Sequence, residues 1–293
     1  MLIFLAESRG CWSAMPKRKV WRKNLFENFG FPDNYTDKSF LQELKTNVHF
    51  KPVSFRTAFL GAGHVSKALC CVVLFCLVFV YLDHGWIEAE TVFIFSSIGT
   101  ILAYLLFRYL SPFSDGMLVC LIQDLQIVLI FLLFGYVSSP ILRTLTQSTA
   151  TDTIYATTTF MMCIHLIFLD YNVPAAIVSS SLSLNAAIFG SICLASRLPS
   201  PFHAFVLLTL SVECFVLLPH LMSKLGQSTS ILFIIVATTL CLLWTVSTSF
   251  TVVLLLAILF INVFCPLWFV KWQLYKKNIY GPWDEAVVKV SEL

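Results

Sequence analysis

The chain has 293 residues, of which 58% are hydrophobic and only 12% are charged, and its mean hydropathy is +0.84. A soluble domain carries roughly 45–50% apolar and about 25% charged residues. This chain therefore has too few charged groups to cover the surface of a soluble particle. These values exclude a soluble enzyme, a disordered protein and a secreted disulfide scaffold, and they predict an integral membrane protein.

The formal net charge of +3 is unevenly placed along the chain. Residues 1–56 hold ten of the nineteen Lys and Arg residues but five of the sixteen acidic ones, a local net charge of +5. A basic segment ahead of an apolar body is typical of a cytosolic tail lying on an anionic leaflet. No basic stretch is interleaved with a recognisable nucleic-acid-binding motif, so we expect no nucleic-acid partner.

The start of the chain does not resemble a secretory leader. The apolar run Leu2–Ala6 is shorter than the roughly 7–15 residues that a signal peptide needs, and no basic residue precedes it. Met15, directly before Pro16 and a basic run, is an alternative start to Met1.

Within the basic tail, residues 28–47 predict a turn followed by a short amphipathic surface helix. Pro32-Asp33-Asn34 is typical of a turn, and Ser39 with Gln42 forms a capping box. One face of the helix would then carry Phe40, Leu41, Leu44 and Val48. Such a helix either anchors the tail at the membrane interface or docks a partner.

Eight segments are apolar and long enough to cross a bilayer core of about 30 Å as a helix, which takes roughly 20 residues. They lie at about 65–82, 91–110, 117–138, 152–170, 173–195, 201–219, 229–248 and 250–271. Only Ser247-Thr248-Ser249 separates the last two, which predicts a tight helical hairpin. We predict an all-α polytopic protein: a bundle of about eight transmembrane helices (57–272) between a cytosolic N-terminal segment (1–56) and a cytosolic C-terminal tail (273–293).

Basic residues predict the orientation of this bundle. Eight spans place both termini on one side, together with sixteen Lys and Arg residues, whereas Arg143 and Arg197 fall on the other side. This bias predicts cytosolic termini. The glycosylation sequon Asn34-Tyr35-Thr36 would then never meet the glycosylation machinery.

The sequence lacks the motifs of several enzyme classes. It contains no Gly-x-Gly-x-x-Gly, Walker, His-Glu-x-x-His or Gly-x-Ser-x-Gly pattern, and no Asp-x-Asp pair for a metal-bound nucleotide sugar. None of the ten Cys residues forms a Cys-x-x-Cys pair. We therefore expect no metal, no cofactor and no catalytic residue on this chain, although a membrane transferase can conceal its catalytic groups.

Polar residues inside apolar spans are costly and therefore informative. Asp124, His165, Asn185 and Glu213 fall within the third, fourth, fifth and sixth spans. Such groups either hydrogen-bond between helices and fix their packing, or they serve function. Among these four residues, Asp124 and Glu213 are the first that we expect to serve function.

Two other polar groups in the spans have simpler interpretations. Lys67, with His64, opens the first span, from which its long side chain could reach the cytosolic face. The small hydroxylated residues Ser179–Ser181 and Ser183 in the fifth span predict close helix packing. The densest polar stretch, residues 138–155, is predicted to join spans three and four, either as an ordinary connector or as a functional one.

Four stretches of the chain closely resemble the phosphatidylinositol glycan class C (PIG-C) family. They are Phe31–Leu44, Ser139–Ala156, the segments between His165 and Pro199, and Asn278–Ala286. The resemblance runs from about Trp21 to Ala286. Spans one to three and six to eight match mainly in pattern.

The resemblance implies a function. PIG-C proteins are endoplasmic-reticulum subunits of the complex that transfers N-acetylglucosamine from UDP-GlcNAc to phosphatidylinositol, the first step of GPI-anchor synthesis. The transfer itself is assigned to another subunit, PIG-A. The resemblance therefore implies a non-catalytic, multi-pass subunit that holds the complex together and presents phosphatidylinositol. A polytopic lipid transporter or scramblase, and a membrane enzyme using Asp124 or Glu213, are the alternatives.

The stretches that carry the resemblance supply the candidate partner- or lipid-binding residues. These are Asp33, Asn34, Tyr35, Arg143, Thr144, Asp152, Tyr155, Asp170, Asn185, Trp283 and Asp284. For a lipid headgroup we favour the motifs around Asp33–Tyr35 and Trp283-Asp284, which could equally dock a subunit. The charge count places Arg143–Asp152 on the luminal side, although the reaction is cytosolic. Three explanations remain: the segment is luminal and serves assembly, it is re-entrant, or one span is misassigned.

Overall fold

The computed structural model describes residues 35, 45–47, 50–110, 117–144, 148–171, 179–226 and 229–280. The chain divides into two units, one formed by residues 1–51 with 275–293 and the other by Pro52–Leu274. The predicted turn at 32–34 and residues 36–44 of the predicted amphipathic helix lie outside the described residues. So do four candidate site residues, Asp33, Asn34, Trp283 and Asp284.

The smaller unit contains a two-stranded antiparallel pair. Strand β1 (Lys45–Thr46) pairs with β2 (Ile279–Tyr280), with Lys45 opposite Tyr280. Asn47 ends β1 in the left-handed region at φ 58°, which Asn tolerates, and its N–H donates to the carbonyl of Asn278 at 2.9 Å. The predicted helix therefore does not extend over Lys45–Asn47, because pairing with the C-terminal segment takes these residues into a strand.

The larger unit is helical. Its helices are α2 (Phe55–Asp83), α3 (Ala89–Leu110), α4 (Met117–Thr144), α5 (Thr151–Phe168), α6 (Ser180–Ala195), α7 (Pro201–Val212), α8 (Leu218–Leu225), α9 (Thr229–Val246), α10 (Thr248–Leu259) and α11 (Cys265–Trp272). The π-helical turn η1 (Glu213–Leu217) joins α7 to α8, η2 (Phe260–Phe264) joins α10 to α11, and the 3-10 turn η3 (Gln273–Tyr275) follows α11. The described residues of the larger unit thus form eight helical rods.

Six of the described rods are long and apolar enough to cross a membrane: Phe55–Asp83, Ala89–Leu110, Leu121–Leu142, Pro201–Leu225, Thr229–Val246 and Thr248–Tyr275. The prediction of an all-α, multi-pass bundle is confirmed. The fourth and fifth predicted spans correspond to α5 and α6, which are not among these six. α5 begins with a Thr-rich turn, and α6 has 16 described residues, about 24 Å of helix.

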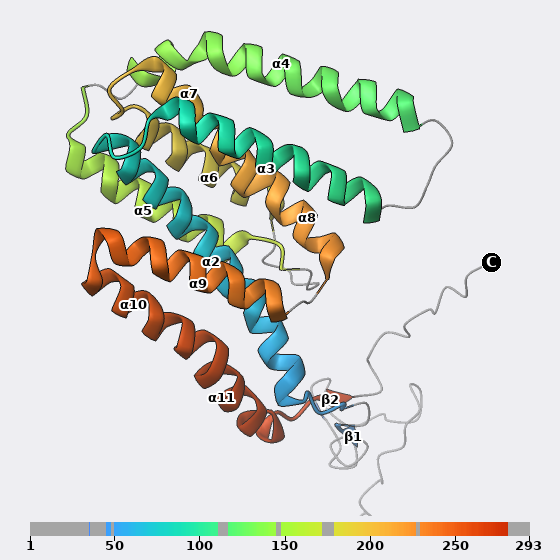
Figure 1. The fold of residues 1–293 in the computed structure, drawn as a ribbon. Helices are drawn as coiled ribbons and strands as arrows, with labels where there is room; N and C mark the ends of the chain where they lie inside the picture. The colour runs from blue at the N-terminus through green and yellow to red at the C-terminus, as the bar shows by residue number, and fades with distance from the viewer. Residues whose placement is uncertain are drawn as a thin grey trace, which may run out of the picture. The chain divides into compact units, whose positions relative to one another are not determined.

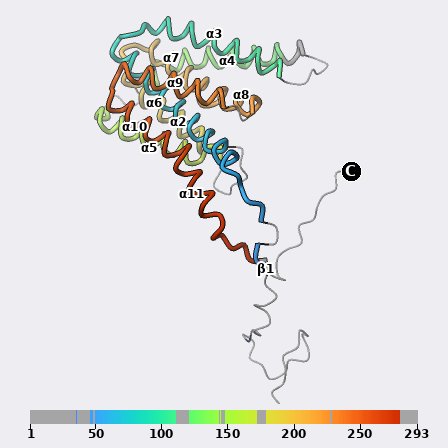
Figure 2. The backbone as a smooth tube through the Cα atoms, turned by 60° about the horizontal axis from the view of Figure 1, so that its bottom comes forward, coloured from blue at the N-terminus to red at the C-terminus, as the bar shows by residue number. Residues whose placement is uncertain are grey.

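The rods are stacked in a consistent order. Figure 1 shows α3 and α4 on one side of the larger unit and α10 and α11 on the other, with α2 between them, and Figure 2 shows the same order from another side. α7 packs against α2, α3, α4 and α6, whereas α9 packs against α2 and α10. The core between these rods includes Phe75 and Phe215, whose ring centroids lie 5.1 Å apart.

The outer faces are apolar rather than polar. Ala89 is the one buried residue of α3, and large side chains such as Phe95 and Phe134 are 70% and 71% exposed. A soluble protein rarely exposes contiguous apolar surface on this scale. We therefore treat the larger unit as embedded in lipid.

Serine caps decide where three helices begin. Ser54 Oγ accepts a hydrogen bond from the Thr57 N–H, so α2 begins ten residues before the predicted span. Ser200 caps α7 in the same way. Ser247 separates α9 from α10 with an extended backbone (φ −158°, ψ 121°) and caps α10, which confirms the predicted helical hairpin.

Each π-helical turn comes directly before a proline. Pro219 and Pro266 have no N–H, and their rings would clash with the carbonyl four residues back in a regular helix. The wider turn relieves this clash, and the Leu218 N–H donates instead to the carbonyl of Glu213, five residues back. The sixth span therefore continues through Pro219 to Leu225, beyond its predicted end.

Candidate functional site between α2, α5, α8 and α9

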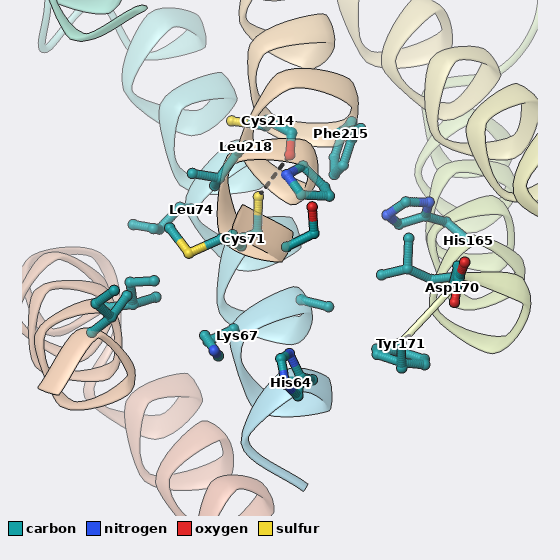
Figure 3. Close-up of a pocket in the computed structure, with 17 residues that line it drawn as sticks. His64, Lys67, Cys71, Leu74, His165, Asp170, Tyr171, Cys214, Phe215 and Leu218 are labelled. Atoms are coloured by element: carbon teal, nitrogen blue, oxygen red, sulfur yellow. Dashed lines mark hydrogen bonds between the residues drawn. The ribbon is translucent and has the colours of Figure 1, made fainter. Parts of the chain in front are cut away.

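A cavity of about 230 Å³ lies within the larger unit, toward the end at which α2 and α9 begin and α5 and α8 end. Its polar and charged lining residues are His64, Lys67, His165, Asp170, Tyr171 and Ser223. The rest of the lining is mostly apolar and includes Leu74, Phe215 and Ile235. The cavity therefore combines two basic side chains of α2 with polar groups opposite them and with apolar side chains (Figure 3).

The cationic wall is formed by α2. Lys67 is only 9% exposed, and His64 lies one turn earlier on the same helix face. Among the residues that the structure describes, Lys67 has neither a hydrogen-bond nor an ion-pair partner. A buried charge without a partner is expensive, so this lysine stands out from the rest of the bundle.

The opposite wall comes from the end of α5 (Figure 3). His165 is 2% exposed, and its Nδ1 lies 2.8 Å from the Ser183 hydroxyl oxygen on α6, which holds the ring in place. Tyr171 donates a 2.6 Å hydrogen bond to the carbonyl of Leu166. Burial raises the pKa of Tyr171 to about 12, so its phenol stays protonated. Asp170, which is exposed, supplies a carboxylate on this side.

The third wall is the π-helical turn η1 with the start of α8. Because Pro219 has no N–H to donate into the preceding turn, upstream carbonyls are left without a helical partner. The carbonyl of Cys214 instead accepts a hydrogen bond from the Cys71 thiol at 3.4 Å. The ring of Phe215 packs on His165 with centroids 4.9 Å apart. The turn thus joins the α2 wall to the α5 wall.

Two of the candidate site residues, His165 and Asp170, line this cavity. The others that the structure describes lie elsewhere. Tyr155 packs on Phe79 of α2 with ring centroids 6.2 Å apart, and Asp152 is exposed in the first turn of α5. Asn185 is on α6 outside the cavity lining, and Tyr35 is exposed in the smaller unit. Within the larger unit, Tyr155, Asp152 and Asn185 are therefore not part of this cavity.

The dense polar stretch at 138–155 is mostly helix, which corrects its interpretation as a connector. Residues 138–144 belong to α4, and residues 151–155 belong to α5. The Ser138 and Thr144 hydroxyls donate to the carbonyls of Phe134 at 2.7 Å and Ile141 at 2.9 Å. Hydroxyl groups that hydrogen-bond to their own helix are compatible with an apolar environment. The many hydroxyl side chains in residues 138–155 therefore do not indicate a loop. Arg143 lies on α4, but its side chain is outside the described residues.

Asp124 and Glu213 both contact polar side chains of α3. The hydroxyl of Tyr104 on α3 donates to Asp124 on α4 at 2.7 Å. The side chains of Ser96 and Thr100 on α3 lie near the carboxyl group of Glu213 on η1. Both contacts support the interpretation that these groups fix helix packing, and neither residue lines the cavity.

Replacing Tyr104 with phenylalanine is expected to lower the stability of the purified chain by about 1 kcal/mol, because the Asp124 carboxyl group loses its partner. Adding Asp124→Leu should recover most of this loss, since both polar groups are then gone. Thermal unfolding in detergent measures both effects. Tyr109→Phe, at an 86% exposed position of the same helix, is the control. A double variant less stable than the single one would contradict this assignment.

Comparison with known proteins identifies the family. A family profile named GPI2 and described as "Phosphatidylinositol N-acetylglucosaminyltransferase" matches residues 21–284. The chain belongs to this family. It is 38% identical over 280 residues to a Homo sapiens protein named as a subunit of phosphatidylinositol N-acetylglucosaminyltransferase, covering 93% of this chain and 94% of the relative. It is 30% identical to the GPI2 subunit of Schizosaccharomyces pombe, covering 94% and 88%. No solved structure matches this chain.

The GPI2 match confirms the resemblance detected in the sequence and includes every residue of the cavity. It gives no support to the alternative of a lipid transporter or scramblase. Lys67 and Tyr171 were not among the candidate site residues in the sequence analysis. A lysine within an apolar span was the available signal, and the structure buries its side chain to 9% exposure against the cavity.

Proposed function

We propose that this chain is a non-catalytic membrane subunit of the complex that transfers N-acetylglucosamine from UDP-GlcNAc to phosphatidylinositol, the first step of GPI-anchor synthesis. The observation that carries the proposal is the match to the GPI2 family over residues 21–284, with relatives named as subunits of this transferase. The six long apolar helices support a subunit embedded in the membrane.

Sugar transfer is proposed to fall to a partner, a PIG-A-like catalytic subunit. The chain has no Asp-x-Asp pair to hold a nucleotide sugar with a metal. Among the described residues, no group of three or more His, Cys, Asp or Glu side chains is placed to hold a metal ion. What the larger unit offers instead is a rigid helical frame and the cavity beside α2. We infer that the chain supports assembly and the lipid side of the reaction.

The proposed location is the endoplasmic-reticulum membrane, with both termini in the cytosol. The excess of basic residues at the ends of the chain supports this orientation. The cavity, at the end where α2 begins, would then face the cytosolic leaflet. The segment joining α4 to α5 would lie at the luminal end and serve assembly; within this chain, Arg197 Nη2 donates to its Thr149 carbonyl at 2.7 Å and holds it beside the start of α7. An unoccupied sequon at Asn34 is the expected result.

The test is capture of the tagged full-length chain from membranes in a mild detergent. We expect the captured material to transfer N-acetylglucosamine from UDP-GlcNAc to phosphatidylinositol and to contain a second chain with the nucleotide-sugar motif. Monodisperse captured chain without transfer activity, with the activity retained in the depleted membranes, would overturn the proposal.

A further inference from the structure

We propose that the cavity between α2, α5, α8 and α9 binds the phosphate-bearing headgroup of a glycerophospholipid, with the ammonium group of Lys67 as its counter-charge. That this lipid is the phosphatidylinositol of the transferase reaction rests on the proposed function. The proposal is argued from the charge, the lining and the depth of the cavity.

The charge of Lys67 requires a partner that the described chain does not provide. The side chain is 9% exposed and lines the cavity, while the nearest ionisable neighbour on its own helix is His64, which is no counter-ion. Asp170 lies across the cavity (Figure 3), yet Lys67 forms no ion pair with it. Lysine binds phosphate as a point charge, and charge-assisted hydrogen bonds are roughly twice as strong as neutral ones. An anion in the cavity would therefore remove the penalty of the buried cation.

The remaining lining matches an amphiphile better than a free anion. His64, Ser223 and Asp170 offer hydrogen-bonding groups to the hydroxyls of a polar headgroup. Leu74 and Ile235 offer apolar contact to the glycerol backbone and the first carbons of acyl chains. A volume of about 230 Å³ lies below the roughly 300–1,000 Å³ of pockets that enclose drug-sized ligands. The cavity therefore suits a headgroup, with the acyl chains left in the bilayer.

The depth of Lys67 in α2 agrees with this ligand. α2 has 29 residues, about 43 Å of helix, whereas a bilayer core of about 30 Å takes roughly 20 residues. Counting back from Asp83 at the far end of α2, the core begins near His64, so Lys67 lies about 5 Å inside its boundary. That is a few ångströms below the headgroup layer of the nearer leaflet, a depth that a long lysine side chain spans. The cation is thus placed where a lipid headgroup can reach it.

The proposal is tested with a photo-crosslinkable phosphatidylinositol, carrying the reactive group on an acyl chain, added to membranes that contain the full-length chain. Lys67→Met, which removes the charge and keeps the length, should reduce crosslinking at least tenfold, and Lys67→Arg should retain most of it. Lys271→Met is the matched control, because Lys271 is an exposed lysine in the last turn of α11 that does not line the cavity. Crosslinking of Lys67→Met at the unaltered level would overturn the proposal.

A stability measurement separates a binding role from a structural one. If Lys67 is held for a ligand, Lys67→Met removes an unpaired buried charge, and the thermal midpoint of the delipidated chain should stay equal or rise. A structural lysine would instead show a lower midpoint together with the loss of crosslinking, and that result would overturn the proposal.

Competitors identify the ligand chemistry. Unlabelled phosphatidylinositol should displace the probe, whereas diacylglycerol with the same chains and inorganic phosphate alone should not. Displacement by inorganic phosphate as efficient as by the lipid would mean a free-phosphate site and overturn the lipid assignment. If Lys67-dependent crosslinking occurs but the captured chain shows no transferase, the proposed function fails and the lipid site stands. Transferase activity without Lys67-dependent crosslinking would overturn the lipid site and leave the proposed function standing.

Discussion

Replacing Gly190 with isoleucine is expected to destabilise the chain by about 1–3 kcal/mol, the usual result of forcing extra carbon atoms into a packed contact. A Cβ atom at Gly190 would lie 3.2 Å from Met162 Cε and 3.5 Å from Met161 Cβ, so α6 could keep a larger side chain only by moving away from α5. That movement would break the hydrogen bond, 3.4 Å long, that the Thr158 hydroxyl donates to the Gly190 carbonyl. The thermal midpoint of the purified chain measures the loss.

The same substitution should also weaken the lipid cavity, because α6 holds the α5 wall in place through Ser183 and His165. We expect reduced crosslinking to the phosphatidylinositol probe together with the reduced stability. Gly99→Ile is the matched control, since Gly99 is an exposed helical glycine of α3 with no atom within 4 Å of an added Cβ. Equal stability of the Gly190 and Gly99 variants would show that the contact between α5 and α6 is not as tight as described.

In the assembled transferase, Lys67→Met is expected to raise the KM for phosphatidylinositol about 10- to 100-fold. This range corresponds to the loss of one charge-assisted hydrogen bond, about 1.5–3 kcal/mol, at about 1.4 kcal/mol for each tenfold change. The KM for UDP-GlcNAc should not change, because we place the nucleotide sugar on a different subunit. Initial rates of the captured complex at varied concentrations of each substrate measure both constants.

Two comparisons make this kinetic result specific. The amount of the catalytic partner recovered with the Lys67→Met chain should equal that recovered with the unaltered chain, since Lys67 faces a cavity inside the bundle. Lys271→Met should leave both KM values unchanged. A rise in the KM for UDP-GlcNAc, or loss of the partner, would mean that Lys67 acts on assembly and not on lipid binding.

The long apolar runs allowed most of the fold to be predicted, because a membrane-spanning helix requires a continuous stretch of apolar residues. The break at Ser247 was also predictable, since a cap and a short polar run are local features. The extension of α2 back to Phe55 and the continuation of the sixth span through Pro219 into α8 were not predicted. The first depends on the Ser54 cap, and the second on a π-helical turn that absorbs the proline.

The candidate site was harder to predict than the fold. Its lining residues come from α2, α5 and the residues after it, η1, α8 and α9, and no motif connects Lys67 with Tyr171 or Ser223. Hydroxyl-rich stretches are more conspicuous in the sequence than a single lysine, yet residues such as Ser138 and Thr144 hydrogen-bond to carbonyl groups of their own helix. A single lysine in an apolar run has two physical interpretations, reaching the surface or facing a cavity. Only the packing of α5 and η1 against α2 distinguishes them.

The most direct test of the central claim is to remove this chain from cells that make it and to measure GlcNAc-phosphatidylinositol formed from UDP-GlcNAc in their microsomes. Synthesis should disappear although the catalytic partner is still present, and it should return when the full-length chain is restored. Microsomes that lack the chain and still form GlcNAc-phosphatidylinositol at the normal rate would contradict its assignment as a subunit of the transferase.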